Sequence, residues 1–319
     1  MKAVICRAYG PPEVLQLGDV PEPRLKSNGV RIRMVATAVT ASDCLVRGLR
    51  FRGWRRVFLR AAFGVRAPRR IMGMIASGEV EAVGPQVTAF RPGDRVFGMD
   101  GFRGGTYAEI VCWPAKSLAL APANLSFEEA AALPYGGLIA SHFIRRLNVH
   151  EGQRVLIYGA SGAIGTSAVQ LAGHRGAEVT GVCSTTNVEL VRSLGARSVI
   201  DYTKSDYVEA GPFDVIFDAV GRRKSAQAMA RSDAALAPGG VSMSVDDEFP
   251  RTQGTDLVTL KQLAESGEFR PVIDRTFRLD EIVEAHRYVD QGHKKGNVTV
   301  TVAAAKAEAR SLQSQDIAR

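Results

Sequence analysis

Residues 154–173 read RVLIYGASGAIGTSAVQLAG, and this stretch decides the fold of the chain. An apolar run ends at Tyr158, and Gly159, Gly162 and Gly165 then mark the turn into a helix of small residues. Glycines let backbone amides approach a pyrophosphate, and the start of a helix adds a positive dipole. The spacing is GxxGxxG, a pattern that a plain tight turn can also produce. Its place between a strand and a helix favours a dinucleotide-binding site.

Strands and helices alternate on the C-terminal side of this stretch, which predicts a parallel sheet covered on both faces. Before about Pro122, short β runs broken by Gly and Pro predict a compact, mostly antiparallel domain. A final strand resembles that domain in texture, so the chain is expected to return there. The expected strands after the glycine stretch are 178–183, 198–201, 213–220, 239–245 and 297–302, and the clearest helical patterns are 166–174 and 187–195.

Length and composition indicate a folded protein of two domains. The chain has 319 residues, of which 45% are hydrophobic and 23% charged, and this excludes collagen, coiled coil and wholesale disorder. Its four cysteines lie far apart without a CxxC pair, which argues against a disulfide scaffold and predicts a reducing cytoplasm. The N-terminus is not that of a signal peptide. The uncharged run 155–173 is better explained as strand, loop and buried helix than as a membrane span.

The net charge of +8 has a local origin. Nine arginines and no acid lie between Arg47 and Arg70, and the rest of the chain is near neutral. Without a nucleic-acid-binding motif, this distribution predicts no nucleic-acid partner. Aromatic residues near helical spacing alternate with the arginines over 51–70, so this segment is a lid over a cleft, a contact with an anionic membrane surface, or an attractor for an anionic substrate.

The second strand of the expected parallel sheet ends without an acid. An Asp or Glu there would bind the ribose 2′-hydroxyl of NAD. Cys183 and Ser184 stand at this place, so a 2′-phosphate meets no repulsion and NADP(H) is favoured over NAD(H). The nearest cation, Arg192, lies in the following helix and is not an obvious phosphate ligand.

Several blocks of the sequence resemble the medium-chain dehydrogenase/reductase superfamily, in its zinc-independent quinone-oxidoreductase (zeta-crystallin-like) branch. They include GEVEAVGPQVTAFRPGDRVFG, GGTYAEIV, the glycine stretch, FDVIFDAVG and AHRYVDQGHKKGNVTV. The resemblance implies an α/β chain with a GroES-like β domain and a Rossmann doubly wound parallel sheet. We place the GroES-like catalytic and substrate domain at 1–122 and 272–319, and the Rossmann domain at 123–271.

The residues at the zinc-ligand positions of related enzymes argue against zinc. Zinc members carry a Cys before a Ser/Thr-Asp pair, where this chain has Thr40, and a Gly-His-Glu motif, where it has Gly73, Met74 and Ile75. Thr, Met and Ile do not form a tetrahedral zinc site. We therefore expect no metal.

The resemblance also implies which residues hold the cofactor. Ser161, Gly162, Ala163 and Ile164 would line the pyrophosphate, while Ser184 and Tyr202 would hold the 2′-phosphate, although Val188 replaces the usual lysine there. The remaining cofactor-binding positions by motif are Thr40, then Ala219, Val220 and Gly221 along the nicotinamide ribose, and finally Gly296 and Asn297.

Three departures from the family pattern bear on activity and assembly. Ile139 stands where relatives carry a threonine beside the nicotinamide, and Ile75 where they often keep a glutamate. Only the short polar stretch 246–255 occupies the place of the last Rossmann strand, which commonly forms the dimer. We expect that strand to be missing and the protein to be a monomer or an atypical dimer.

Asp43 and Tyr135 are the candidate catalytic residues, with Tyr107 a weaker one. A structural hydrogen bond is the alternative role for Asp43 and Tyr107, and solvent can protonate an enolate or hydroquinone without a general acid. The leading hypothesis is a zinc-free, NADPH-dependent reductase of quinones or α,β-unsaturated carbonyls, with a small hydrophobic substrate. The alternatives are a cofactor-binding module with little turnover and, third, a zinc alcohol dehydrogenase.

Overall fold

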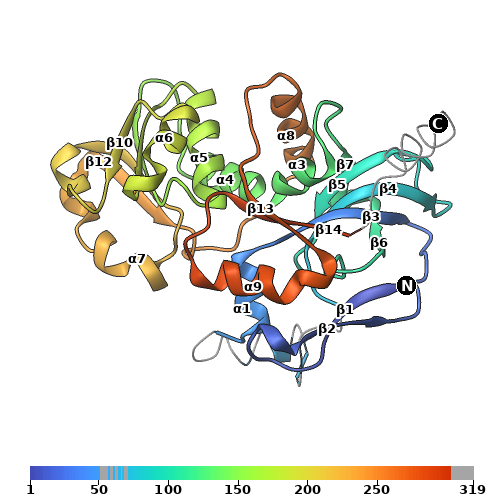
Figure 1. The fold of residues 1–319 in the computed structure, drawn as a ribbon. Helices are drawn as coiled ribbons and strands as arrows, with labels where there is room; N and C mark the ends of the chain where they lie inside the picture. The colour runs from blue at the N-terminus through green and yellow to red at the C-terminus, as the bar shows by residue number, and fades with distance from the viewer. Residues whose placement is uncertain (51–56, 58–59, 62–63, 66, 68–70, 303–319) are drawn as a thin grey trace, which may run out of the picture.

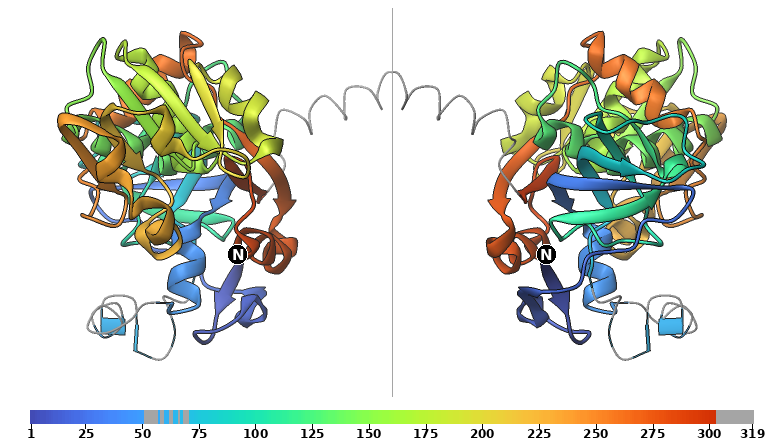
Figure 2. Two further views of the ribbon diagram at one scale, coloured as in Figure 1. Left: turned by 90° about the vertical axis from the view of Figure 1, so that its left-hand side faces the viewer. Right: turned by 90° about the vertical axis from the view of Figure 1, so that its right-hand side faces the viewer.

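The structure, a computed structural model, describes residues 1–302 apart from 51–56, 58–59, 62–63, 66 and 68–70. Two lobes lie side by side, and the C-terminal strands β13 and β14 pass back to the lobe that holds the N-terminus (Figures 1 and 2). The segment 51–70, for which the sequence offers three roles, lies mostly outside the described residues.

One lobe is built on a five-stranded parallel sheet, which confirms the Rossmann prediction. Apolar runs such as VLI in β8 make its central strands, because a parallel sheet is buried on both faces. The sheet ends at β12, and the described residues between β12 and the next helix form turns and loop rather than a sixth strand. In spatial order the strands are β10 (Ser198–Asp201), β9 (Glu178–Cys183), β8 (Arg154–Tyr158), β11 (Phe213–Asp218) and β12 (Leu236–Ser244).

Helices cover both faces of this sheet. Phe143 of α4 (Pro134–Arg146) stacks on Phe217 of β11, and α4 shares one core with α5 (Ala163–His174) and α8 (Asp256–Glu265). On the other face, strand residues pack against Met229 of α7 (Arg222–Met229) and the single turns η4 (Tyr207–Ala210) and η5 (Ser232–Ala235). Two short elements, η3 (Thr185–Asn187) and α6 (Val188–Ser193), link β9 to β10.

The other lobe is built on a seven-stranded sheet that is antiparallel except where β13 pairs with β14. β14 pairs with β3, so the chain returns to its N-terminal lobe as predicted. The limits of the two domains stay a prediction. The strands are β3 (Gly29–Val39), β4 (Ile75–Val83), β5 (Arg95–Met99), β6 (Ile110–Pro114), β7 (Leu118–Leu120), β13 (Ile273–Arg278) and β14 (Asn297–Thr301).

The remaining elements of this lobe surround the sheet. A two-stranded ribbon of β1 (Lys2–Cys6) and β2 (Leu15–Asp19) lies near α1 (Ala41–Arg47) and α9 (Ile282–Gln291) (Figure 2). The short helix α3 (Phe127–Ala132) leads toward α4 of the Rossmann lobe, and single turns lie at η1 (Pro12–Val14), η2 (Ala115–Ser117) and η6 (Leu279–Glu281).

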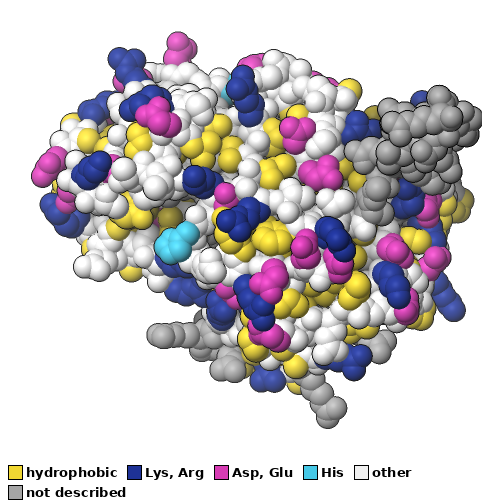
Figure 3. Space-filling model, in the orientation of Figure 1, with side chains coloured by type: hydrophobic (Ala, Val, Ile, Leu, Met, Phe, Trp, Pro, Cys, Tyr) yellow, Lys and Arg dark blue, Asp and Glu magenta, His cyan; other side chains and the backbone are white. Residues whose placement is uncertain are grey.

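The face of the molecule drawn in Figure 3 agrees with a near-neutral charge outside the arginine segment. Acidic and basic side chains mix over the face drawn in Figure 3, with hydrophobic side chains exposed only in small groups. Among the described residues, none of the helices is long and apolar enough to cross a membrane.

A buried charge cluster joins α1 to α9. The Arg47 guanidinium is completely buried and donates to Asp290 at 2.5 Å and to Nδ1 of His286 at 2.8 Å. Burial, with the neighbouring guanidinium, lowers the pKa of His286 to about 3. The imidazole is therefore neutral in the folded protein at every pH near neutrality.

The low pKa of His286 in the folded protein predicts a loss of folding stability at acidic pH. An unfolded histidine takes up a proton near pH 6.5, whereas folded His286 does so only near pH 3, so proton binding stabilises the unfolded state relative to the folded state as the pH falls between these values. We expect His286 to cost about 2 kcal/mol of unfolding free energy between pH 7 and pH 5. Urea unfolding of the wild type and of His286→Gln over this range isolates the effect, because all other groups are common to both. A difference in stability between the two proteins that does not change with pH would contradict it.

Candidate functional site

The glycine loop, residues 159–165, forms a backbone surface that we call the glycine cradle, and its conformation and close packing require glycine. Gly159 has a φ of +77°, and a Cβ at Gly165 would lie 2.1 Å from the carbonyl oxygen of Gly159. Gly162 is the N-cap of α5 and brings no side chain over the first turn. The N–H groups of that turn have no carbonyl one turn back, so they are open to an anion. The fold thus places the start of a helix, with its N–H groups free of carbonyl partners one turn back, where the sequence predicts a pyrophosphate site.

The loop before β14 closes on this cradle. The N–H of Gly296 donates to the carbonyl of Ser161 at 2.8 Å, and Gly162 and Gly296 form an isolated β bridge. Asn297 donates from its side chain to the carbonyl of Val272 at 3.1 Å, so its amide also anchors the loop. The structure therefore brings together the glycine loop and the C-terminal motif, although they are far apart in sequence.

Asn187 links the glycine loop to the loop after β9. Its Nδ2 donates to Ser161 Oγ and to Ser184 Oγ, each at 3.1 Å. Asn187 is buried, and its Oδ1 has no partner among the described residues. A buried acceptor without a donor is costly unless a ligand supplies one. This orphaned oxygen and the glycine cradle fit a dinucleotide with a ribose hydroxyl at this point.

An acidic side chain from β10, the strand that pairs with β9 at the edge of the sheet, lies in the same region. Asp201, the last residue of β10, accepts from Thr185 Oγ1 at 2.5 Å and from Thr203 Oγ1 at 2.7 Å. These hydrogen bonds lower the pKa of Asp201 to about 2. The neighbouring Tyr202, a predicted 2′-phosphate ligand, is 56% exposed and therefore accessible to a ligand.

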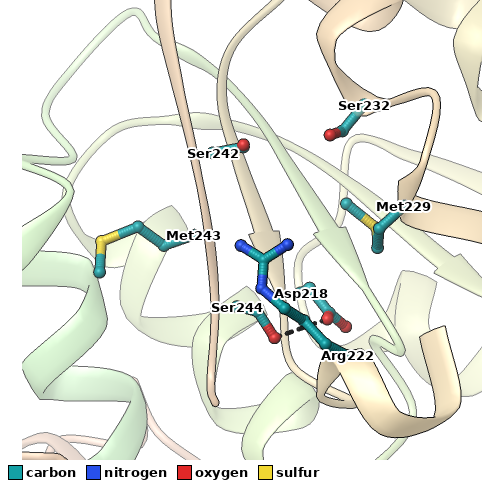
Figure 4. A pocket seen from close by; sticks show the side chains of 7 residues that line it. All are labelled: Asp218, Arg222, Met229, Ser232, Ser242, Met243 and Ser244. Carbon is teal, nitrogen blue, oxygen red and sulfur yellow. Dashed lines mark hydrogen bonds between the residues drawn. The ribbon is translucent and has the colours of Figure 1, made fainter. Parts of the chain in front are cut away.

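A second buried aspartate holds the loop 219–221. Asp218 Oδ1 accepts the N–H groups of Val220 at 3.0 Å and Gly221 at 3.2 Å. Its Oδ2 accepts the hydroxyls of Ser225 and Ser244, and the second of these bonds is drawn in Figure 4. The small hollow in that view lies between α7 and β12 beside this carboxylate. Asp218 thus fixes the backbone that the sequence places along the nicotinamide ribose.

Thr40 and Asp43 form the N-terminal cap of α1. Asp43 is buried and accepts from Thr40 N at 2.9 Å and Thr40 Oγ1 at 2.7 Å, while its own N–H donates back to Thr40. Burial raises the pKa of Asp43 to about 6, against the opposing effect of these hydrogen bonds. The geometry favours a capping role for Asp43 over proton donation.

Tyr135 is positioned at the start of α4. Its hydroxyl is hydrogen-bonded to Ser42 Oγ at 2.9 Å, and burial raises its pKa to about 12. A Cβ at the following Gly136 would lie 2.1 Å from the carbonyl oxygen of Ala163, the first residue of α5. This close approach brings the start of α4 against the first residue of α5.

Comparison with known proteins identifies the family. The chain matches a family model described as zinc-binding dehydrogenase over residues 163–271 and one described as alcohol dehydrogenase GroES-like domain over residues 26–123. It is 32% identical over 315 residues to a 2-methylene-furan-3-one reductase of Solanum lycopersicum, a match that covers 94% of this chain and 79% of that protein. The chain belongs to the medium-chain dehydrogenase/reductase superfamily.

Other members of the superfamily agree with the quinone-oxidoreductase-like branch. A chloroplastic NADPH-dependent alkenal/one oxidoreductase of Arabidopsis thaliana is 31% identical over 316 residues, covering 94% of this chain and 79% of that protein. A solved structure of the quinone oxidoreductase from Coxiella burnetii superposes with a TM-score of 0.81 at 28% identity, over 95% of this chain and 99% of that one. The predicted branch is confirmed, and the chain is an oxidoreductase of the medium-chain dehydrogenase/reductase type.

The zinc-ligand positions of the superfamily hold no suitable donors here. The Thr40 hydroxyl donates to Asp43 and lies 3.9 Å from the Met74 sulfur, and Ile75 is completely buried in the core. The described residues also contain no group of three His, Cys, Asp or Glu side chains that could hold a metal. The residues present therefore do not fit a catalytic zinc ion.

Four contributors to the site received no role from the sequence: Ser42, Asn187, Asp201 and Asp218. Three of them had a signal. Asp201 ends the strand predicted at 198–201, and Asp218 lies two residues before the end of the strand predicted at 213–220, so both are near the carboxyl edge of the sheet, where open α/β sheets bind ligands. Ser42 lies inside the Thr40–Asp43 capping motif. The bridging contacts of Asn187 join residues 26 and 3 positions away and could not be read from spacing.

Gly165→Ala tests the cradle. The added Cβ would meet the Gly159 carbonyl at 2.1 Å, so α5 must move and dinucleotide binding should weaken on the order of tenfold or more, with a loss of thermal stability. Gly173→Ala, in the same helix, is the matched control because nothing lies within 4 Å of its Cβ. The control should bind normally and be up to about 1 kcal/mol more stable. Equal effects of the two substitutions in a titration and a melting curve would refute the cradle.

Proposed function

We propose that this enzyme transfers hydride from NADPH to a quinone or an α,β-unsaturated carbonyl, without a catalytic metal. The observation that carries the proposal is the Ser42–Tyr135 hydroxyl pair, which lies at the start of α4, the helix that packs closely against the first residue of α5. In this proposal the pair offers a hydrogen-bond donor to a substrate oxygen near the expected cofactor. The similar proteins named as alkenal/one, furanone and quinone reductases support this substrate class.

In this proposal the protein's own residues bind the cofactor, orient its nicotinamide ribose and donate a hydrogen bond to the substrate. The nicotinamide cofactor supplies the hydride when bound. The start of α5 would hold the pyrophosphate, and the loop fixed by Asp218 would lie along the nicotinamide ribose. Tyr135 keeps its proton at neutral pH because burial raises its pKa, so its hydroxyl can stabilise negative charge that develops on a carbonyl oxygen. The proton that completes the reduction can come from solvent.

Apolar residues support a dry reaction site. Ile139 lies on α4 one turn after Tyr135 and is buried, as is Ile75. Both pack in the core that extends across the two lobes. This packing explains how the chain accommodates isoleucine where the family resemblance implies polar residues. It also defines the alternative, a cofactor-binding module with little turnover, which the first experiment separates from a reductase.

NADPH is the proposed cofactor. No acid directly follows β9, and Ser184 and the exposed Tyr202 stand where a 2′-phosphate would lie. One of the similar proteins is named NADPH-dependent. The site test is the oxidation of NADPH and of NADH against a panel of quinones and enones. Acceptor-dependent oxidation supports the reductase, whereas tight cofactor binding without oxidation by any acceptor favours the binding module.

Tyr135→Phe tests the proposed donor. Loss of the hydroxyl should lower kcat about a hundredfold and leave the cofactor KM nearly unchanged, because the proposal assigns this hydroxyl to the acceptor and not to the cofactor. Tyr207→Phe is the matched control, since its hydroxyl donates to the Ala228 carbonyl on the far face of the Rossmann sheet. Similar kcat values for Tyr135→Phe and the wild type would remove Tyr135 from the mechanism.

The pH dependence of kcat distinguishes the two candidate catalytic residues. A catalytic acid at Asp43, with a pKa of about 6, would lose its proton above that pH, and the rate would fall tenfold for each further pH unit. Tyr135, with a pKa of about 12, keeps its proton throughout. We expect kcat to be flat between pH 6.5 and about 9. A decline that begins near pH 6 would assign the proton to Asp43.

Location and assembly are also proposals. We propose a protein of the reducing cytoplasm, a monomer or an atypical dimer, in keeping with four free cysteines and a parallel sheet that ends at β12 in the described chain. For the segment 51–70, binding to anionic but not neutral liposomes would distinguish membrane contact from a lid.

A further inference from the structure

Two strands of the parallel sheet end together at the cofactor edge. In the register of β9 and β10, Asp201 lies opposite Cys183, the residue before Ser184. Both side chains therefore stand at the carboxyl ends of their strands, where an open α/β sheet binds its ligand. No acidic residue ends β9 in the sequence, but the pairing of β10 with β9 brings Asp201 to that position.

The Asp201 carboxylate already accepts the hydrogen bonds of the threonine hydroxyls that would otherwise be available to a phosphate. Thr185 Oγ1 donates to its Oδ2 at 2.5 Å, and Thr203 donates to its Oδ1 from both N at 3.0 Å and Oγ1 at 2.7 Å. A hydroxyl has one proton, so neither threonine can donate to a second anion at the same time. Lys204 lies 3.5 Å from the carboxylate, and its ammonium is largely exposed.

The charge of this carboxylate is permanent near neutral pH. Its hydrogen bonds hold the pKa of Asp201 at about 2. The donors left for a ligand are the Ser184 hydroxyl, which accepts from Asn187, and the Tyr202 hydroxyl on an exposed ring. A ribose 2′-hydroxyl can donate to a carboxylate, whereas a 2′-phosphate is repelled by it.

We propose that Asp201 determines the cofactor choice of this enzyme: it accepts the 2′-hydroxyl of NAD(H), weakens the binding of NADP(H), and so leaves the enzyme able to use both. This inference rests on the proposed dinucleotide site and modifies its preference. Replacement of the carboxylate by an amide removes the repulsion and favours the 2′-phosphate, because the Oδ2 that accepts from Thr185 becomes an NH2 group and the Thr185 hydroxyl is released as a donor.

Asp201→Asn tests the proposal by binding, without turnover. The probes are 2′,5′-ADP and 5′-AMP, which differ at the 2′ position of the ribose, titrated by calorimetry at low salt. The substitution should lower the Kd of 2′,5′-ADP on the order of tenfold and leave that of 5′-AMP unchanged or a few-fold higher. The gain should shrink as salt is raised, because the repulsion is screened.

Two further variants make the result specific. Glu209→Gln removes the same charge from the exposed turn before β11, at the opposite end of the sheet, and should change neither Kd. Thr185→Val should matter little in the wild type, where Asp201 holds that hydroxyl, but should reverse part of the gain in Asp201→Asn. A gain that is equal in the Glu209 variant would reduce the effect to net charge and overturn the proposal.

The outcomes separate this inference from the proposed function. An unchanged ratio of the two Kd values in Asp201→Asn overturns the role of Asp201 and leaves the dinucleotide site standing. If neither nucleotide binds the wild type or the variant, the dinucleotide site and the role of Asp201 fail together. As a catalytic readout, the ratio of kcat/KM for NADPH to that for NADH should rise in parallel with the binding ratio.

Discussion

One backbone hydrogen bond, from the Gly296 N–H to the carbonyl of Ser161, holds the C-terminal segment of one lobe against the glycine loop of the other. Gly296 has a φ of +54°, and a Cβ there would lie 2.3 Å from the carbonyl oxygen of Val272. The contact therefore requires glycine for both conformation and space. Because the residues on either side run into β14 and through it into the seven-stranded sheet, this bond sets how the lobe carrying Thr40 and Ser42 faces the cradle.

Close backbone contacts recur wherever the site is assembled. Gly165 lets α5 approach the end of β8, and Gly136 lets α4 approach the first residue of α5. Side chains with two hydrogen-bonding atoms then connect the loops: Asn187 spans two of them, and Asp218 fixes a third. The site is thus a set of backbone surfaces tied by a few buried polar groups, which suits a cofactor that performs the redox chemistry itself.

Much of the framework was predictable from local pattern. The strands at 154–158, 178–183 and 198–201 agree residue for residue, since apolar runs bounded by turn residues define them. The strand expected at 213–220 ends at Asp218, because that carboxylate turns the next residues into a loop. The first turn of α5 was missed at Ala163, since its small residues belong equally to the glycine loop.

The chemistry of the site was less predictable, because it depends on contacts between distant segments. No acidic residue directly follows β9, as the sequence indicates. Asp201 nevertheless lies next to Cys183 in the sheet, because β10 pairs with β9, although the two residues are 18 positions apart in the chain. Asp43 is a catalytic candidate from its place in the Ser-Asp pair, with a structural hydrogen bond as the alternative role, and its use as a helix cap favours that alternative. Residue type suggests what a side chain can do, and the tertiary contacts decide which of those roles is available.

The sheet edge at β12 has a consequence for colloidal behaviour. An edge strand offers unpaired amides and carbonyls that can template strand pairing between molecules, the first step toward fibrils. β12 contains Pro238, which has no N–H, and Gly239, whose φ of +79° interrupts the extended backbone. These residues interrupt the first half of the edge, which leaves only the short run Val241–Ser244 as a continuous template for strand pairing.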